Sequence, residues 1–220
     1  DGVGLFRSQD AGQSWIMMST VGLTDKSIQA FAVCPSGKIY AGTWGSGVFR
    51  HDPQIQEWTQ VNNGLPQKFI SAVSCDSQSV AMVGTYDQGV YRTVDEGANW
   101  TAANQGLRDG PNDRRILALL ALPGIVGLGT VNGAYKSLDG GKTWLSAGLI
   151  GHGVYDFAVD RAGSGQIWVG TNSGGVFTSF DQGESWTSLG GPPVIFTVTQ
   201  GWDLQLYAGT RDSGVYRYEN

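Results

Sequence analysis

The sequence predicts an all-β protein built as a β-propeller, with five four-stranded blades in a single domain over residues 1–220. Two observations predict it: tryptophans at nearly equal steps, and short β-rich runs that recur with the same step. Steps of 43, 42, 44 and 42 residues separate Trp15, Trp58, Trp100, Trp144 and Trp186. Four β-rich runs in each period of about 43 residues is the spacing of propeller blades.

Four of these tryptophans end an octet of the form Ser/Thr-x-Asp-x-Gly-x-x-Trp. The octets cover residues 8–15, 93–100, 137–144 and 179–186, and a degenerate copy covers 51–58, where Pro53 and Ile55 replace Asp and Gly. The defining residues of the intact copies are Ser8, Asp10, Gly12, Trp15, Thr93, Asp95, Gly97, Trp100, Ser137, Asp139, Gly141, Trp144, Ser179, Asp181, Gly183 and Trp186.

The chemistry of the octet favours a structural role over a catalytic or metal-binding one. Its Asp can accept hydrogen bonds from backbone N–H groups of its own turn, and its Gly supplies a position with positive φ. The first hydroxyl adds a further local bond. The Trp covers apolar surface between sheets while its indole N–H reaches a polar partner. We therefore expect each octet to clamp the hairpin between the third and fourth strands of a blade.

Each period also carries three further β-rich runs. The first is rich in Ile, Ala, Phe and Val, the second ends in Gly-Thr, and the third reads Gly-Val-Tyr/Phe-Arg or a close variant. No segment has an apolar period of 3.6 residues long enough for a helix. The run Ile116–Leu122 takes the place of the first strand, so we interpret it as a buried strand.

The ends of the chain predict how the ring closes. The third run occurs six times, first at residues 4–7 and last at 214–217, whereas the Gly-Thr run occurs five times. We expect the N-terminal hairpin to supply the outer strands of the blade whose inner strands lie in residues 194–210, because this closure removes exposed sheet edges. Two alternatives stay open: a fragment of a six- to eight-bladed parent, or an assembly of several chains.

The octets resemble the Asp-box, or BNR, repeat of sialidase-like β-propellers, and the resemblance spans essentially the whole chain. The same repeat occurs in sialidases, xyloglucan-cleaving glycosidases, sortilin-type receptors and photosystem assembly factors. The resemblance therefore implies the fold and leaves the activity open. It also implies that the octets lie on the rim opposite the usual ligand face.

The resemblance argues against sialidase chemistry in this chain. It implies three convergent arginines, a Tyr activated by a Glu, and an acidic proton donor. Of the four glutamates, Glu57, Glu96 and Glu184 lie in the octet hairpins and Glu219 is penultimate, so none is left for the Tyr. The Arg-Ile-Pro segment of sialidases is also missing.

The composition of the chain narrows the classes of partner that we expect it to bind. The chain has 34 Gly in 220 residues, 15% charged and 11% aromatic residues, which is typical of a turn-rich β protein. A net charge of −5 argues against nucleic acid or anionic lipid, and no apolar run approaches the roughly 20 residues of a membrane helix. His51 and His152 lack a second ligand at metal spacing, so we expect no metal and no cofactor.

Two cysteines, Cys34 and Cys75, occupy similar places in consecutive blades. Neighbouring blades splay apart, and a disulfide needs Cα atoms within about 7 Å, so we expect two buried thiols rather than a bond. We expect an extracytoplasmic or secreted protein, since the chain begins within a repeat and a leader could have been removed.

A ligand is expected on the face opposite the octets, where loops follow the second strands. These loops place Trp44, Tyr86, Asn132, Asn172 and Arg211 at corresponding positions, with Asp87 beside Tyr86. Two aromatics, an Arg and amides suit a shallow sugar or peptide site. The alternative is that these positions are merely free to vary.

One loop between blades is longer than the others. Residues 104–115 carry Arg108, Arg114 and Arg115, which would suit a carboxylate or phosphate. Their alternative role is to pair with Asp109 and Asp113 at the surface.

The sequence thus favours a non-enzymatic propeller that binds a protein, a peptide or a glycan. A single pair of aromatics, rather than one per blade, favours one composite site and a protein or peptide ligand. The main alternative is a glycosidase with paired carboxylates. Its candidate groups are Asp25, Asp87, Asp109, Asp156 and Asp212.

Overall fold

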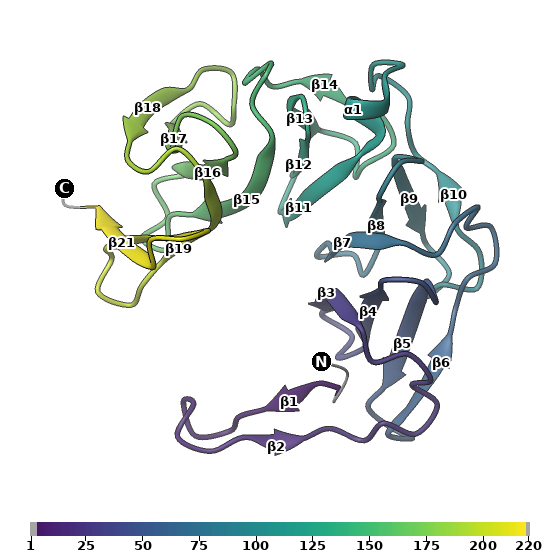
Figure 1. The fold of residues 1–220 in the computed structure, drawn as a ribbon. Coiled ribbons are helices and arrows are strands. Elements are labelled where there is room, and N and C mark those ends of the chain that lie inside the picture. Colours follow the sequence, from purple (N-terminus) through teal and green to yellow (C-terminus); the bar gives the residue numbers. More distant parts are fainter. Residues whose placement is uncertain (1–3, 219–220) are drawn as a thin grey trace.

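The computed structural model describes residues 4–218 and confirms an all-β fold. Six small antiparallel sheets stand side by side in an arc, with their first strands toward its centre (Figure 1). The elements in chain order are β1 (Phe6–Arg7), β2 (Ile16–Met17), β3 (Ile28–Val33), β4 (Ile39–Thr43), β5 (Val48–Asp52), β6 (Glu57–Gln60), β7 (Ile70–Cys75), β8 (Ala81–Thr85), β9 (Val90–Thr93), β10 (Thr101–Ala102), α1 (Pro111–Arg114), β11 (Ile116–Leu122), β12 (Ile125–Thr130), β13 (Gly133–Ser137), β14 (Leu145–Ser146), β15 (Val154–Val159), β16 (Ile167–Thr171), β17 (Val176–Ser179), β18 (Thr187–Gly190), β19 (Ile195–Gln200), β20 (Leu206–Thr210) and β21 (Val215–Tyr218).

Four sheets are complete and follow the predicted strand order. They are β3–β6, β7–β10, β11–β14 and β15–β18, each with its strands paired in chain order. The run Ile116–Leu122 is β11, the innermost strand of the third complete sheet, as predicted. A short helix, α1, lies in the long connection before β11 and begins at a Pro, which is favourable at a first helical turn.

The Gly-Thr pairs explain how neighbouring sheets approach each other. A Cβ added to Gly84 would lie 2.3 Å from a methyl carbon of Ile116, the first residue of the next inner strand, so no larger residue fits without movement. Gly42 stands in the same relation to Ile70, at 2.4 Å. The following Thr is buried, and the Oγ1 of Thr85 donates to the carbonyl of Gly89, closing the turn to the third strand.

The predicted ring closure is wrong for this structure. The fifth sheet consists of β19, β20 and β21, and the N-terminal hairpin β1–β2 is a separate two-stranded sheet. Because β21 already pairs with β20, the edge that β1 was expected to take is filled. Figure 1 shows the two ends of the arc apart, and a groove of about 540 Å³ lies between the hairpin and the first complete sheet.

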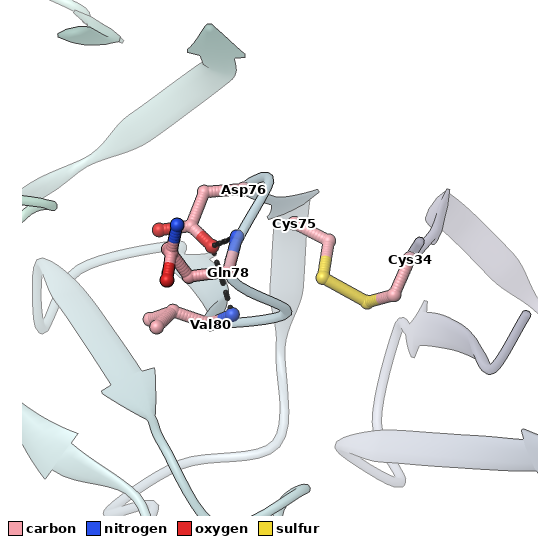
Figure 2. The surroundings of a disulfide bond; sticks show 5 residues. All are labelled: Cys34, Cys75, Asp76, Gln78 and Val80. Atoms are coloured by element: carbon pink, nitrogen blue, oxygen red, sulfur yellow. Dashed lines mark hydrogen bonds between the residues drawn. A yellow bond between two sulfur atoms is a disulfide. The ribbon is translucent and has the colours of Figure 1, made fainter. Parts of the chain in front are cut away.

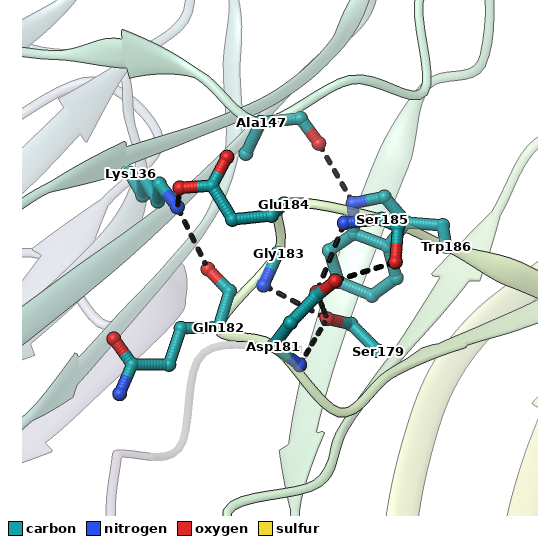
Figure 3. A network of polar contacts seen from close by, with 9 residues as sticks. All are labelled: Lys136, Ala147, Ser179, Asp181, Gln182, Gly183, Glu184, Ser185 and Trp186. Carbon is teal, nitrogen blue, oxygen red and sulfur yellow. Dashed lines mark hydrogen bonds and ion pairs between the residues drawn. The ribbon is translucent and has the colours of Figure 1, made fainter.

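The octets form the expected clamps. In the fourth copy the Ser179 hydroxyl donates to Asp181 at 2.8 Å and accepts from the N–H of Gly183 at 2.8 Å (Figure 3). Asp181 also accepts from the N–H of Ser185 at 2.9 Å. All four octet glycines have φ between 78° and 89°, which confirms the positive-φ requirement, and they are Gly12, Gly97, Gly141 and Gly183.

The octet tryptophans join each sheet to the one before it. The indole N–H of Trp144 donates to the carbonyl of Ala103 at 2.8 Å, and that of Trp186 donates to Ala147 at 2.7 Å (Figure 3). Trp58 and Trp100 make the same bond to the sheet before theirs. Trp15 departs from the prediction, because it is 62% exposed where no sheet precedes its hairpin among the described residues.

The degenerate octet keeps the packing and loses the turn network. Trp58 is 4% exposed and donates its indole N–H to Ser19 at 2.8 Å. His51 replaces the octet hydroxyl, is buried, and packs against Trp58 with ring centroids 5.0 Å apart. Its ring nitrogens have no hydrogen-bond partner among the described residues, and burial lowers the pKa of His51. The Trp contact therefore persists without the Asp.

The expectation of two free thiols is also wrong, because Cys34 and Cys75 form a disulfide (Figure 2). Their Cα atoms are 5.3 Å apart. Blades splay toward the outside of the arc, but these residues sit at the ends of inner strands β3 and β7, where neighbouring sheets converge. The turn after Cys75 is tightened by Asp76, whose carboxylate accepts from the N–H groups of Gln78 and Val80.

The octet aspartates predict an acid-sensitive fold. Hydrogen bonds from Asn99 and Thr93 lower the pKa of Asp95 from 3.8 to about 2. Because the folded-state pKa lies below the unfolded one, the stabilisation is present above about pH 4 and disappears as the pH falls toward 2. We expect Asp95→Asn to reduce the loss of stability between pH 5 and 2, measured as the urea midpoint at each pH. An unchanged pH dependence would contradict this role.

Candidate ligand-binding face

The two ends of each sheet carry different loops. The turns between second and third strands lie beside the connections between sheets, since the N–H of Gly45 donates to the carbonyl of Lys68 and that of Gly89 to Arg114. We call this end the loop face. The octets and the turns between first and second strands lie at the opposite end, the octet face. This division agrees with the antiparallel strand order.

Three aromatic side chains and one arginine gather on the loop face of the first three complete sheets. The Trp44 ring lies 5.4 Å from the rings of both Phe69 and Tyr86, and the Trp44–Tyr86 ring planes are 87° apart. The guanidinium of Arg115 lies 4.0 Å from the centroid of Tyr86, a cation–π contact. We call Trp44, Phe69, Tyr86 and Arg115 the aromatic cluster.

The cluster is open to solvent although its backbone is fixed. Trp44 is 46% exposed and Phe69 is 44% exposed. The N–H of Trp44 donates to Ser27 at 3.1 Å, that of Tyr86 donates to Phe69 at 3.2 Å, and Trp44 forms an isolated β-bridge with Phe69. Rings that stay half exposed on a hydrogen-bonded frame are typical of a binding surface.

The sequence pattern predicted Trp44, Tyr86 and Arg115 as site residues, but it did not indicate Phe69. Phe69 immediately precedes β7, and Arg115 immediately precedes β11, so both hold the same place in the repeat. The residue before an inner strand lies beside the residue that follows the second strand of the same sheet, since the backbone N–H of Tyr86 donates to the carbonyl of Phe69. Comparing the residues that precede each inner strand would have found it.

Two other predicted residues border the cluster without joining its ring contacts. The amide of Gln67 donates to the carboxylate of Asp87, next to Tyr86. Arg114 pairs with Asp109 at 2.8 Å, as the alternative interpretation of the long loop expected, but Asp113 is buried and accepts from Tyr135 and Asn132 instead of pairing at the surface. The three arginines therefore do not form one anion clamp, because Arg115 stacks on Tyr86 and Arg108 lies near Tyr135.

A buried network anchors the long connection. Asp113 is 4% exposed and accepts from the Tyr135 hydroxyl at 2.5 Å and from the Asn132 amide at 3.2 Å. Burial first, and then the bond to Asp113, raises the pKa of Tyr135 to about 12. Asn132 is thus part of this network. In the third complete sheet, the residue equivalent to Trp44 and Tyr86 is Val131, whose N–H donates to the carbonyl of Arg115. The turn between the second and third strands is one residue shorter in this sheet, so Asn132 does not take that position.

The remaining predicted residues lie on other sheets. The Asn172 side-chain oxygen accepts from the N–H of Gly153 at 2.7 Å, which ties its turn to the preceding connection. Arg211 follows β20 and lies 3.9 Å from Asp212 in an exposed ion pair. Figure 1 places the fifth sheet at the opposite end of the arc from β3 and β4. Asn172 and Arg211 therefore belong to the fourth and fifth sheets and take no part in the ring contacts of Trp44 and Tyr86.

The described residues 4–218 contain no group of three or more His, Cys, Asp or Glu placed to hold a metal ion. Within the same residues, no helix has the length and apolar character needed to cross a bilayer.

Comparisons with known proteins support the fold. No protein-family model and no curated protein matches the chain. An ancestral GH74 enzyme aligns over 100% of this chain at 18% identity, with a TM-score of 0.77. The GH74 xyloglucanase of Xanthomonas campestris aligns over 100% at 15% identity and a TM-score of 0.67. The extracellular domain of a hybrid two-component system of B. thetaiotaomicron aligns over 89% at 16% identity and a TM-score of 0.73.

The likeness extends to the propeller fold only. The chain spans 34%, 42% and 27% of the lengths of these three structures, respectively. At identities this low, the structural similarity establishes the architecture alone and leaves the activity of this chain open.

Proposed function

We propose that this protein is a non-enzymatic propeller module that binds a peptide or protein segment on its loop face. The observation that carries the proposal is the aromatic cluster, in which half-exposed Trp44 and Phe69 stand beside Tyr86 and Arg115. Aromatic residues and Arg are the residue types enriched where proteins bind each other most tightly. The fixed backbone limits the conformational entropy lost on binding.

A single composite site favours a peptide over a repeated glycan site. Trp44 and Tyr86 are the two aromatic residues that directly follow second strands, and both contribute to one cluster. A lectin with one sugar site per sheet would carry a similar ring after each second strand. The equivalent residues in the next three sheets are Val131, Asn172 and Arg211.

The candidate carboxylates support binding rather than hydrolysis. Asp156 accepts from the hydroxyl of Thr197 at 2.7 Å and from the N–H of Val198 at 3.0 Å, which ties β15 to β19. Asp109 pairs with Arg114. For Asp25, burial raises the pKa, but hydrogen bonds from Ser27 and neighbouring hydroxyls outweigh it and leave the pKa low. A glycosidase acid needs a raised pKa.

An extracytoplasmic location fits the same proposal. The Cys34–Cys75 disulfide belongs to an oxidising compartment. One of the structures that the chain resembles is an extracellular domain.

Peptide selection from a random library displayed on phage tests the site. We expect saturable binding of selected peptides, weakened at least about tenfold by Trp44→Ala or Phe69→Ala, since each removes a contact ring. Arg211→Ala is the matched control, because it alters an exposed residue of the same face on a distant sheet. Equal weakening by the control, or glycan-array binding lost in Trp44→Ala, would overturn the peptide assignment.

A second experiment tests the absence of catalysis. We expect no release of reducing sugar from a panel of soluble polysaccharides. Hydrolysis that disappears in Asp87→Asn or Asp156→Asn would contradict the non-enzymatic part of the proposal and leave the peptide-binding test unaffected.

A further inference from the structure

The octet face carries an exposed tryptophan that the fold does not explain. Trp202 is 90% exposed in the turn between β19 and β20, whereas Trp144 of the third complete sheet is 2% exposed. The corresponding turns of the other sheets hold no aromatic residue; they comprise residues 34–38, 76–80, 123–124 and 160–166. A turn at this place therefore does not need an indole ring to form. An exposed tryptophan also gives up the favourable free energy of burying its apolar surface.

The Trp202 ring is held in place although it is exposed. The guanidinium carbon of Arg161, in the turn after β15, lies 4.3 Å from the ring centroid. The backbone N–H of Arg161 donates to the side-chain oxygen of Gln200 at 2.6 Å. Gln200 is 7% exposed, and its amide also donates to Asp160 at 3.0 Å and to the carbonyl of Leu204 at 3.2 Å. One buried side chain thus fixes both turns beneath the ring.

The hydrogen bonds of Gln200 link the fourth and fifth sheets at the place where the disulfide links the first two complete sheets. Gln200 is the last residue of β19 as Cys75 is of β7, and Asp160 follows β15 as Cys34 follows β3. The two turns are therefore joined at a position where the fold also uses a covalent bond. These hydrogen bonds preorganise the Trp202 ring and the Arg161 guanidinium for binding.

Polar side chains predominate around the ring, and Leu204 of the same turn is 48% exposed. Asp203, which follows Trp202, accepts from the Tyr207 hydroxyl at 2.6 Å and from the N–H of Gln205 at 3.2 Å. A ligand here meets one open face of a flat apolar ring, because the guanidinium of Arg161 covers the other face, and Asp203, the next residue along the turn, carries a carboxylate. A stable protein interface needs about 800 Å² on each partner and an apolar core wider than a single ring. A pyranose ring fits better, because one face presents C–H groups and its edge presents hydroxyls.

We propose that Trp202 and Arg161 form a second binding site, on the octet face, for a pyranose unit of a glycan. The open face of the indole stacks on the sugar's C–H face, Arg161 covers the opposite face and holds the ring in place, and Asp203 accepts hydrogen bonds from the sugar's hydroxyls. The site lies on the face opposite the aromatic cluster and does not depend on the peptide-binding function of that cluster.

Isothermal titration with four hexasaccharides tests the proposal: cellohexaose, mannohexaose, chitohexaose and hexagalacturonic acid. We expect at least one to bind the full chain saturably and to quench indole fluorescence. Trp202→Ala should weaken that binding at least about tenfold. Trp202→Phe should retain part of it, because a smaller ring still stacks, and Trp44→Ala should leave it unchanged. All variants should keep the wild-type urea midpoint, because both tryptophans are on the surface.

Three results would overturn the site. The first is that none of the four sugars binds the wild type. The second is that Trp202→Ala leaves the affinity unchanged, or that Trp44→Ala weakens it as much. The third is that Trp202→Ala alters only self-association measured by light scattering, which would identify the ring as a protein contact.

Discussion

Trp144→Ala is expected to lower the free energy of unfolding by about 3–5 kcal/mol, the usual cost of truncating a buried Trp. Trp144 is 2% exposed, and its indole N–H donates to Ala103 of the preceding sheet at 2.8 Å. Truncation removes the apolar contact between two sheets and leaves the carbonyl of Ala103 without this donor. Urea unfolding followed by circular dichroism measures the effect.

Trp15→Ala is the matched control for that experiment. It alters the same octet position, but Trp15 is 62% exposed. We expect it to change the stability by less than about 1 kcal/mol, as surface substitutions usually do. If Trp144→Ala costs as little as Trp15→Ala, the octet tryptophans do not stabilise the contact between sheets.

Removing the disulfide is expected to have the second-largest effect. The bond joins residues 41 positions apart, and the chain-entropy estimate for a loop of that length is about 4 kcal/mol. The double variant Cys34→Ser/Cys75→Ser should therefore unfold at a much lower urea concentration than the wild type. Its octets should still form, because their hydrogen bonds are local.

Gln200→Ala is the comparison variant for the removal of the disulfide, since it removes the hydrogen bonds that link the fourth and fifth sheets at the equivalent place. We expect a loss of about 1–3 kcal/mol, the cost of leaving buried partners unpaired. A double Cys variant that is no less stable than Gln200→Ala would contradict the entropic role of the bond.

The repeat made most of the fold predictable. Each octet contains its own hydrogen-bond network, as between Ser179 and Asp181, so eight residues specify the clamp without reference to the rest of the chain. The period of the tryptophans then specifies a row of similar sheets. The strand β11 was predicted for the same reason, because its place in the period outweighed its helix-like composition.

The candidate site was only partly predictable. Trp44 and Tyr86 were selected by their place after second strands, and they do meet. Phe69 was missed because it belongs to the connection before the next inner strand, and a one-residue difference in turn length placed Asn132 in the Asp113 network instead. Contacts between loops of different sheets depend on backbone paths that the repeat pattern does not describe.

The sequence by itself determined the all-β propeller architecture, the strand order within each sheet and the structural role of the octets, because strand pairing and the octet turn lie within one period and the tryptophan contacts repeat between adjacent periods. Tertiary structure decided the rest. It brought Cys34 and Cys75 within bonding distance, placed β21 on the edge expected for β1, and grouped the aromatic cluster. The physical reason is that these features depend on the spacing and angle between neighbouring sheets, which are set by packing across many residues.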